Sequence, residues 1–220
     1  MHDFSYISKN DVKVKEIYKD IVDILNEVQD LIRDKFTFSF TPIGSYSRNM
    51  ITYDKKSNIG FDFDFNIEIN DDDEKFSGGE IKKILINALN RVAIKYGYSY
   101  AEDSTRVITI KKINHLYSCV EHSCDFAIVN NYTDKGCSRQ EYIHFNKKIN
   151  QYYWCQQSKG YYKLPEKIQW LKTNNYWNEL REYYIYKKNA NTDENIHSRT
   201  LFAISVQEIC QKHRYNIKEV

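Results

Sequence analysis

An unbroken alternation of apolar and polar residues runs from Phe61 to Asn70. The polar members are Asp62, Asp64, Asn66, Glu68 and Asn70, and phenylalanine or isoleucine occupies every position between them. Because side chains of a strand alternate between its two faces, this pattern predicts a strand with one face buried. Asp62 and Asp64 then project to the same side, with their Cα atoms about 7 Å apart. Carboxylates placed in this way could share a metal ion.

The segments before and after this strand predict a protein of mixed α and β structure. Residues 11–36 carry apolar residues at three-to-four spacing, which predicts a long amphipathic helix capped near Asn10 or Asp11. Residues 36–43 predict a strand that ends at Gly44, residues 45–50 a short helix or turn, and residues 53–60 a polar loop. Helical spacing returns over residues 79–96, and residues 107–110 and 119–129 predict two strands that form a hairpin around Asn114-His115.

The chain changes character after Asn130, where a connector rich in Tyr and Lys begins. Pro165 is expected to open a helical stretch that reaches about Lys188, and a last helix is expected from Asp193 or Ser198 to about Lys212. The predicted fold class is therefore α+β, with a mixed or antiparallel sheet flanked by helices and a mostly helical C-terminal half. We expect the division at residues 1–135 and 136–220.

Charge and cysteine content narrow the function classes. A net charge of +2 over 220 residues provides no global basic field, so bulk nucleic-acid binding is not indicated. No apolar run approaches the ~20 residues that cross a bilayer, and the first ten residues lack the pattern of a signal peptide. Five cysteines at irregular spacing argue against a disulfide framework, so we expect reduced thiols and a cytoplasmic location. A zinc site is disfavoured because no CxxC or HxxxH pair occurs among His115, Cys119, His122, Cys124 and Cys137.

Three features occur in an informative order. Gly44-Ser45 follows the apolar residues of the first strand, Asp62-x-Asp64 lies on the second, and Asp125 lies in the later strand 123–129. This order resembles the nucleotidyltransferase superfamily typified by DNA polymerase β, and Gly44-Ser45-Tyr46-Ser47-Arg48 looks like the G-S-x-x-R form of minimal nucleotidyltransferases. The resemblance covers roughly residues 36–129. Leu164-Pro165 and the helices after it are similar to the helical half of oligoadenylate-synthase-like and bacterial cyclic-oligonucleotide-synthase enzymes.

The resemblance implies an enzyme that moves a nucleoside monophosphate from an NTP, with ATP expected, to a hydroxyl of a nucleotide or small molecule. It implies two Mg²⁺ ions, or Mn²⁺, held by the catalytic residues Asp62, Asp64 and Asp125. Asp62 and Asp64 bridge both ions, and Asp125 ligates the ion that activates the acceptor hydroxyl. Residues 1–135 are then the catalytic core, and residues 136–220 the half that binds nucleotide or substrate.

The residues themselves suit phosphate chemistry. Gly44 lets the backbone approach a phosphate with no Cβ in the way, and Ser45 offers a hydroxyl and an N–H at a helix start. Arg48, one turn later, could contact the leaving pyrophosphate. Lys187 and Lys188 could approach the phosphates, although a solvated helix end is the favoured explanation of this pair.

Each feature alone has an ordinary explanation. Asp62 and Asp64 suit the solvated face of a strand, Gly44-Ser45 suits any turn, and Arg48 suits any surface. Asp125 lies between Cys124 and Phe126, where a carboxylate is costly unless it is paired or bound to a cation.

Two other function classes remain open. One is a non-catalytic module of the same fold that senses a nucleotide or binds a partner. The other is an interaction domain that uses tyrosine-rich surfaces such as Tyr152-Tyr153-Trp154. The near-neutral charge makes a long nucleic acid the less favoured acceptor, and no membrane partner is expected.

Overall fold

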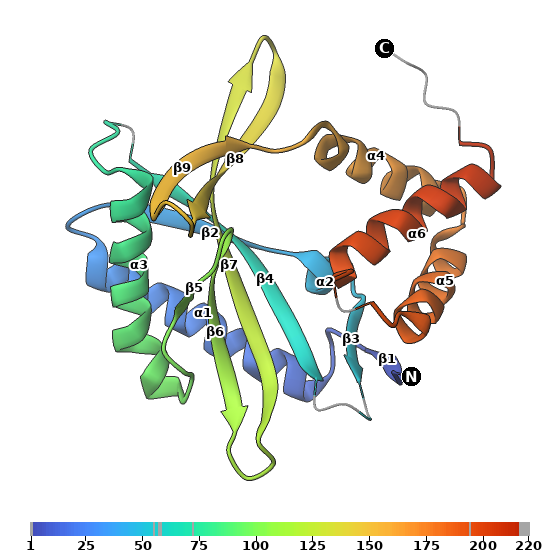
Figure 1. The fold of residues 1–220 in the computed structure, drawn as a ribbon, viewed down its shortest axis with the longest axis horizontal. Coiled ribbons are helices and arrows are strands. Elements are labelled where there is room, and N and C mark those ends of the chain that lie inside the picture. Colours follow the sequence, from blue (N-terminus) through green and yellow to red (C-terminus); the bar gives the residue numbers. More distant parts are fainter. Residues whose placement is uncertain (1, 55, 57–58, 72, 194, 216–220) are drawn as a thin grey trace. The chain divides into compact units, whose positions relative to one another are not determined.

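The computed structural model describes residues 2–54, 56, 59–71, 73–193 and 195–215. Along the chain (Figure 1) the elements are β1 (Phe4–Ile7), α1 (Val12–Ile32), β2 (Thr37–Ile43), α2 (Gly44–Ser47), β3 (Ile51–Asp54), β4 (Ile59–Asn70), α3 (Gly78–Val92), the 3-10 helix η1 (Ala93–Tyr96), β5 (Glu102–Asp103), β6 (Val107–Asn114), β7 (Cys119–Asp134), β8 (Cys137–Asn146), β9 (Gln151–Gln156), α4 (Lys159–Thr173), α5 (Trp177–Ala190) and α6 (Ser198–Lys212).

The chain forms two compact units. The sheet unit comprises the described residues of Tyr6–Tyr53 and Asn58–Gln157, and the helical unit comprises those of Met1–Ser5, Asp54–Ser57 and Ser158–Val220. A functional division at residues 135 and 136 stays a prediction. The predicted loop over residues 53–60 includes residues 55, 57 and 58, which lie outside the described residues. On either side of them, Tyr53 belongs to β3 and Gly60 to β4.

The main sheet has seven strands and is mixed, which confirms the predicted fold class. Its order is β2-β4-β7-β6-β5, with β8 paired to the later part of β7 and β9 paired to β8. The pair β4–β7 is parallel, and the other named pairs of this sheet are antiparallel. The predicted hairpin of β6 and β7 is present. Strands β1 and β3 form a separate two-stranded sheet.

One face of the main sheet is apolar and supports the core. The phenylalanines Phe61, Phe63 and Phe65 of β4 are at most 5% exposed, and they pack with buried residues of α1 and α3. Both helices begin where the sequence provides a cap. The Asp11 side chain accepts a hydrogen bond from the Lys13 amide, and Ser77 and Glu80 form a capping box. The alternation of β4 therefore leaves its polar residues on the other face, which we call the polar face.

The segment expected as a connector is instead two strands. β8 and β9 extend the sheet, with Ile143 buried in the core and with Tyr152 and Trp154 packed against it. Aromatic residues favour strands, but Lys147 and Lys148 at the turn obscured the alternation in the sequence. The prediction for residues 136–157 was wrong in this respect.

The helical unit confirms the mostly helical C-terminal part, with one corrected boundary. α4 begins at Lys159, so Pro165 lies inside the helix rather than at its start. Proline lacks the amide hydrogen that would bond the carbonyl four residues earlier, which costs α4 one bond without ending it. Trp170 contacts the rings of Tyr176 and Tyr215 at centroid distances of 5.6 and 5.0 Å.

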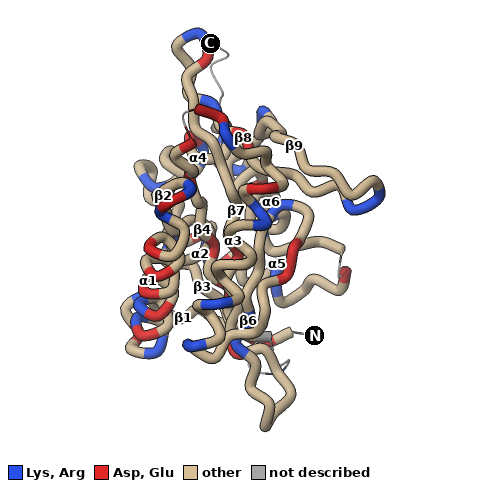
Figure 2. The backbone as a smooth tube through the Cα atoms, turned by 90° about the vertical axis from the view of Figure 1, so that its left-hand side faces the viewer, with Lys and Arg blue, Asp and Glu red and all other residues tan. Residues whose placement is uncertain are grey.

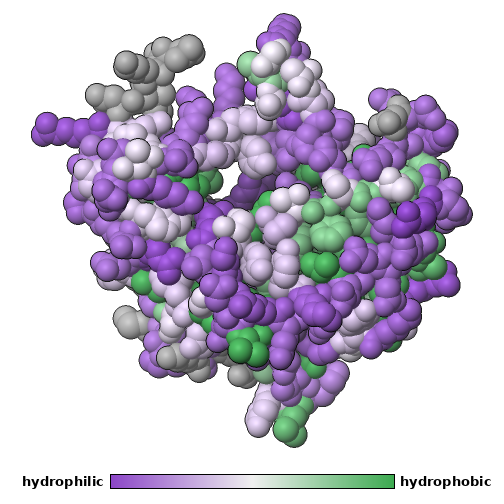
Figure 3. All heavy atoms as spheres, turned by 180° about the vertical axis from the view of Figure 1, so that it is seen from behind, coloured by the Kyte–Doolittle hydropathy of each residue, from purple (hydrophilic) through white to green (hydrophobic). Residues whose placement is uncertain are grey.

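The surface carries charge of both signs. Figure 2 shows Lys and Arg interspersed with Asp and Glu along the chain, as the small net charge requires. Two strongly exposed large apolar side chains lie at the β6–β7 turn, where Leu116 is 82% and Tyr117 67% exposed. Figure 3 shows this turn as the lowest projection of the molecule, with apolar atoms at its tip.

A candidate nucleotidyl-transfer site on the polar face of the sheet

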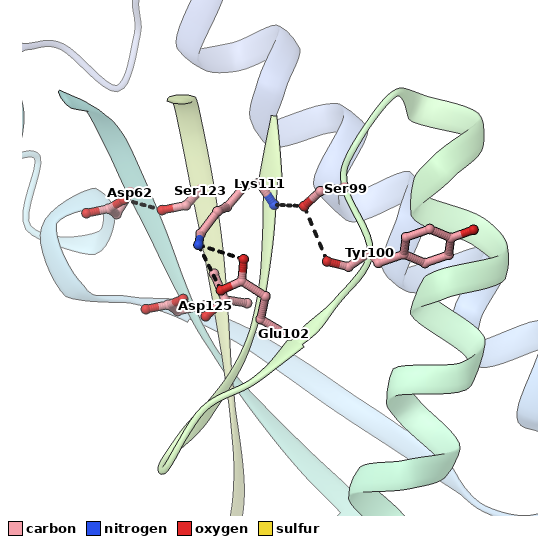
Figure 4. Close-up of polar contacts among 8 residues, drawn as sticks. Asp62, Ser99, Tyr100, Glu102, Lys111, Ser123 and Asp125 are labelled. Atoms are coloured by element: carbon pink, nitrogen blue, oxygen red, sulfur yellow. Dashed lines mark hydrogen bonds and ion pairs between the residues drawn. The ribbon is translucent and has the colours of Figure 1, made fainter. Parts of the chain in front are cut away.

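The three predicted acids lie on neighbouring strands and on one face. In the parallel pair of β4 and β7, Asp64 is the register partner of Asp125, and Asp62 is the partner of Ser123. Since register partners share a face, the carboxylates of Asp62, Asp64 and Asp125 all belong to the polar face. Figure 4 shows Asp62 and Asp125 projecting to the same side of their strands. The structure thus brings together the three residues that the sequence separates by up to 63 positions (125 − 62).

Gly44 lies directly against this group. Ile43, the last residue of β2, is the register partner of Asp64, so the chain turns into α2 beside that carboxylate. A Cβ on Gly44 would lie 1.9 Å from Asp64 Oδ2, and the backbone there has a φ of +65°. Glycine is required at this position for two reasons, because other residues disfavour this φ and because any side chain would occupy the space of Asp64.

The other predicted nucleotide-binding residues follow on the same turn. Ser45 is half-buried in α2, and its carbonyl accepts a hydrogen bond from the Met50 amide at 2.8 Å. Arg48 is the half-buried C-cap residue of α2. Met50 is only 1% exposed, so its side chain belongs to the core rather than to a phosphate site. Contacts of Ser45 and Arg48 with a triphosphate stay predictions.

Aromatic stacking fixes the position of α2. The Tyr46 ring stacks on Tyr18 of α1, with centroids 4.5 Å apart and an interplanar angle of 5°, and it lies 5.5 Å from the Phe63 ring of β4. Burial is the first cause that raises the pKa of Tyr46, and Tyr18 contributes. The turn that carries Gly44 is therefore anchored to both the helix and the strand beneath it.

Asp125 occupies an electrostatically unfavourable position. Burial, first of all, raises the pKa of Asp125 to about 6, and the charges of Asp64 and Asp62 add to this rise. A hydrogen bond from Thr109 Oγ1 to Asp125 Oδ1, 2.6 Å long, acts in the opposite direction on the pKa. Because the charges of Asp64 and Asp62 act on Asp125, the three side chains form one electrostatic group.

Four polar residues around the acids were missed by sequence reasoning. Thr109 bonds Asp125, the Ser123 hydroxyl donates to Asp62 Oδ1, and Lys111 Nζ binds both carboxylate oxygens of Glu102 at 2.7 and 2.8 Å (Figure 4). Thr109 and Lys111 alternate with the buried Ile108 and Ile110, so the period of β6 places them on the polar face. That alternation was the available signal, but register against β7 cannot be obtained from one sequence.

The donor atoms suit a hard divalent cation, although they are not assembled around one. Within the part of the chain that the structure describes, no group of three His, Cys, Asp or Glu side chains is arranged to hold a metal ion. Asp62 and Asp125 each accept a hydrogen bond from a hydroxyl group at Oδ1. Carboxylate oxygens are nonetheless the ligands that Mg²⁺ prefers, and a cation would offset the repulsion that raises the pKa of Asp125. The residues therefore fit the expected metal in kind and in placement on one face.

Lys187 and Lys188 have partners within the helical unit. Lys187 Nζ lies 2.5 Å from Glu208 Oε2, and Lys188 Nζ lies 4.1 Å from the centroid of the Phe4 ring. An approach of either lysine to phosphates stays a prediction.

All five cysteines are free thiols. Among the described residues, no helix combines the length and apolarity that crossing a membrane requires. The cytoplasmic location stays a prediction.

Comparison of the structure with solved structures identifies the fold. No family model and no curated protein sequence matches the chain. Elizabethkingia meningoseptica CdnE, a cyclic dinucleotide synthase solved with GTP and Apcpp, is similar over 91% of this chain and 70% of its own, with a TM-score of 0.53 and 15% identity. Vibrio cholerae DncV, a cyclic AMP-GMP synthase solved with the linear intermediate pppA(3′,5′)pG, is similar over 93% and 67%, with a TM-score of 0.56 and 11% identity.

This chain has the nucleotidyltransferase fold. E. coli MS115-1 CdnC, solved with ATP, adds a third similar structure, which covers 94% of this chain and 62% of its own with a TM-score of 0.51 and 13% identity. The nucleotidyltransferase fold accounts for the mixed sheet, the helices on its apolar face and the helical C-terminal part. At these identities the comparison concerns the fold, and function has to be argued from the site.

Proposed function

We propose that this chain is a Mg²⁺-dependent nucleotidyltransferase, active also with Mn²⁺, that moves a nucleoside monophosphate from an NTP to a hydroxyl group and releases pyrophosphate. The observation that carries this proposal is the pairing of Asp64 with Asp125 on adjacent parallel strands, with Gly44 packed against the Asp64 carboxylate. A strand face that concentrates like charges beside a glycine turn is electrostatically unfavourable unless a cation completes it.

Asp62, Asp64 and Asp125 would hold the metal. When bound, Mg²⁺ neutralises the charge of the triphosphate and of the leaving pyrophosphate. Asp62 is exposed to solvent, whereas Asp64 and Asp125 are half-buried. Asp62 is thus the most accessible to an incoming NTP–Mg²⁺ complex, and the other two are better shielded from competing water.

The residues of the chain have separate roles in the proposed reaction. The acceptor oxygen forms a bond to the α-phosphorus, the bond from that phosphorus to the bridging oxygen breaks, and pyrophosphate leaves with the electron pair. The hydroxyl proton would be taken up by Asp125 as the general base. Ser45 and Arg48 orient the β- and γ-phosphates from the turn after Gly44.

The proposed substrate is an NTP, first of all ATP, and the proposed acceptor is a nucleotide or a small molecule. The solved neighbours contain GTP or ATP, and the DncV complex contains a linear dinucleotide intermediate. A net charge of +2 with both signs interspersed (Figure 2) argues against an acceptor as long as a nucleic-acid strand.

Pyrophosphate release tests the proposal. The chain is incubated with each of the four NTPs in Mg²⁺, in Mn²⁺ and in excess chelator, and pyrophosphate is measured beside calorimetric binding of the same nucleotides. We expect release with at least one NTP in either metal and none in chelator. Metal-dependent NTP binding without any pyrophosphate would instead support the nucleotide-sensing module.

A further inference from the structure

Thr109 makes a partly buried hydrogen bond to one of the proposed metal ligands. It is the register partner of Asp125 across the antiparallel pair of β6 and β7, and it is 8% exposed. Its Oγ1 donates to Asp125 Oδ1 at 2.6 Å. A donor held in a strand restricts the rotation of the carboxylate it bonds, and it directs the second oxygen, Oδ2, away from the bond.

Ser123 provides the same kind of contact to a second ligand. It is the register partner of Asp62 across β4 and β7, and its hydroxyl donates to Asp62 Oδ1. Two of the three acids are therefore each bonded by a hydroxyl on the strand beside them. A hydroxyl suits this task, because it donates a hydrogen bond to a carboxylate and brings no charge that would compete with a cation.

Lys111, a cationic side chain that acts on Asp125, is engaged elsewhere. Lys111, the register partner of Ser123, influences Asp125 electrostatically, but both of its short contacts are to Glu102. Glu102 thus keeps the ammonium group paired beside the acids. An ammonium placed between the carboxylates would replace the divalent cation, whereas hydroxyl donors orient the carboxylates and leave their charge intact.

We infer that Thr109 and Ser123 are positioning residues that restrict the rotation of the Asp125 and Asp62 carboxylates through Oδ1 and leave Oδ2 of each to bind a divalent cation. This inference rests on the proposed function and names two further residues of the same site. Outer partners of metal ligands typically contribute 10- to 100-fold to metal affinity.

The test measures Mn²⁺ affinity by electron paramagnetic resonance on the full chain, and turnover in parallel. The variants are Thr109→Val, which keeps the side-chain shape and removes the donor, Thr109→Ser, which restores the donor, and Ser123→Ala. Thr133→Val is the matched control, because Thr133 is exposed on β7 and bonds neither acid. Circular dichroism and melting temperature report folding of each variant.

We expect Thr109→Val and Ser123→Ala each to weaken Mn²⁺ binding about tenfold, Thr109→Ser to recover most of the affinity, and Thr133→Val to match the wild type. Wild-type affinity in Thr109→Val and Ser123→Ala would overturn the inference while leaving the proposed function intact. Absence of Mn²⁺ binding in the wild-type chain would overturn both. Should Thr109→Val fail to fold, an unchanged affinity in Ser123→Ala would still contradict the inference for Asp62.

Discussion

Gly44 and Asp64 lie so close together that a methyl group on Gly44 would come within 1.9 Å of Asp64 Oδ2. This contact joins the end of β2 to the middle of β4, and it makes a backbone position part of the acid cluster. The glycine was expected to leave room for a phosphate, and the nearest group in the structure is a carboxylate. Either neighbour, the Asp64 carboxylate or a phosphate bound beside it, would need the space that a Cβ on Gly44 would take.

Gly44→Ala should abolish nucleotidyl transfer by displacing the Asp64 carboxylate. The substitution also introduces backbone strain of about 1–3 kcal/mol at a φ of +65°. Gly136→Ala separates the two effects, since Gly136 has a φ of +77° with nothing within 4 Å of an added Cβ. We expect similar losses of stability in urea unfolding for both variants and loss of activity only for Gly44→Ala. Equal activity in the two variants would contradict the structural role of this contact.

The strand of alternating phenylalanines and acids was predictable because its period is strict over ten residues. The same holds for α1, whose apolar residues repeat without interruption and whose cap is Asp11. These elements need no information from elsewhere in the chain. The order of Gly44-Ser45, the Asp pair and Asp125 resembles that of the nucleotidyltransferase superfamily, and this resemblance implied the fold.

What could not be predicted depends on pairing between distant segments. Thr109 and Ser123 matter because of the residues that lie across from them, and a single sequence does not reveal strand register. Residues 136–157 were missed for another reason, since half-buried strands rich in Tyr, Lys and Asn have a weak alternation. Contacts of Ser45 and Arg48 with a nucleotide require a bound nucleotide and remain predictions.

Acid should destabilise the chain through His122. This side chain is 3% exposed, and burial is the first cause that lowers the pKa of His122 to about 4; Glu121 opposes the shift, while Lys112 and Lys13 add to it. Between pH 6.5 and 4 the unfolded chain binds a proton at this residue that the folded chain does not, so stability falls as the pH is lowered through this window.

Replacing His122 by Gln should remove most of that dependence. In the wild type, His122 should lower the free energy of unfolding by about 3 kcal/mol between pH 7 and pH 4. The glutamine side chain leaves the Tyr98 hydroxyl, which lies 2.8 Å from His122 Nε2, with a polar partner. Urea unfolding at both pH values measures it, with the exposed His115→Gln as control. The contribution of Asp125 to the pH dependence has the opposite sign, because its raised pKa makes the free energy of unfolding fall as the pH rises from about 4 to 6. Variants are therefore compared with the wild type at each pH. A parallel pH dependence in His122→Gln and the wild type would exclude this explanation.

Tyr46→Ala should loosen the turn that carries Gly44. Loss of the ring stack with Tyr18 removes about 0.5–1.5 kcal/mol beyond the loss of buried area, and α2 loses its main contact with α1. We expect a lower melting temperature and a raised KM for NTP, because the turn that we propose to contact the phosphates is less well ordered. Tyr46→Phe keeps the ring and should behave almost as the wild type. An unchanged KM in Tyr46→Ala would show that the stack serves stability alone.

A buried ion pair supports the β8–β9 extension of the sheet. Lys82 of α3 is 1% exposed, lies 2.5 Å from Asp103 Oδ1, donates to the Ser104 carbonyl and lies 5.8 Å from the ring centroids of Phe145 and Tyr152. Lys82→Met should destabilise the chain by about 3 kcal/mol, because Asp103 is left without its cation. The neighbouring exposed Lys83→Met is the control, with an expected change below about 0.5 kcal/mol. Equal unfolding midpoints for the two methionine variants would refute this role of the pair.

The most direct test of the acid cluster is a comparison of two carboxylate-to-amide variants on the same strand. Asp64→Asn removes a proposed metal ligand, whereas Glu68→Gln changes a carboxylate four residues along the same face of β4 that pairs with Ser39 and Val129 instead of the cluster. Each chain is incubated with labelled NTPs and Mg²⁺ or Mn²⁺, and the products are resolved by mass spectrometry. We predict pyrophosphate and a nucleotidyl product from the wild type and from Glu68→Gln, and none from a folded Asp64→Asn. Wild-type product formation by Asp64→Asn would contradict the account.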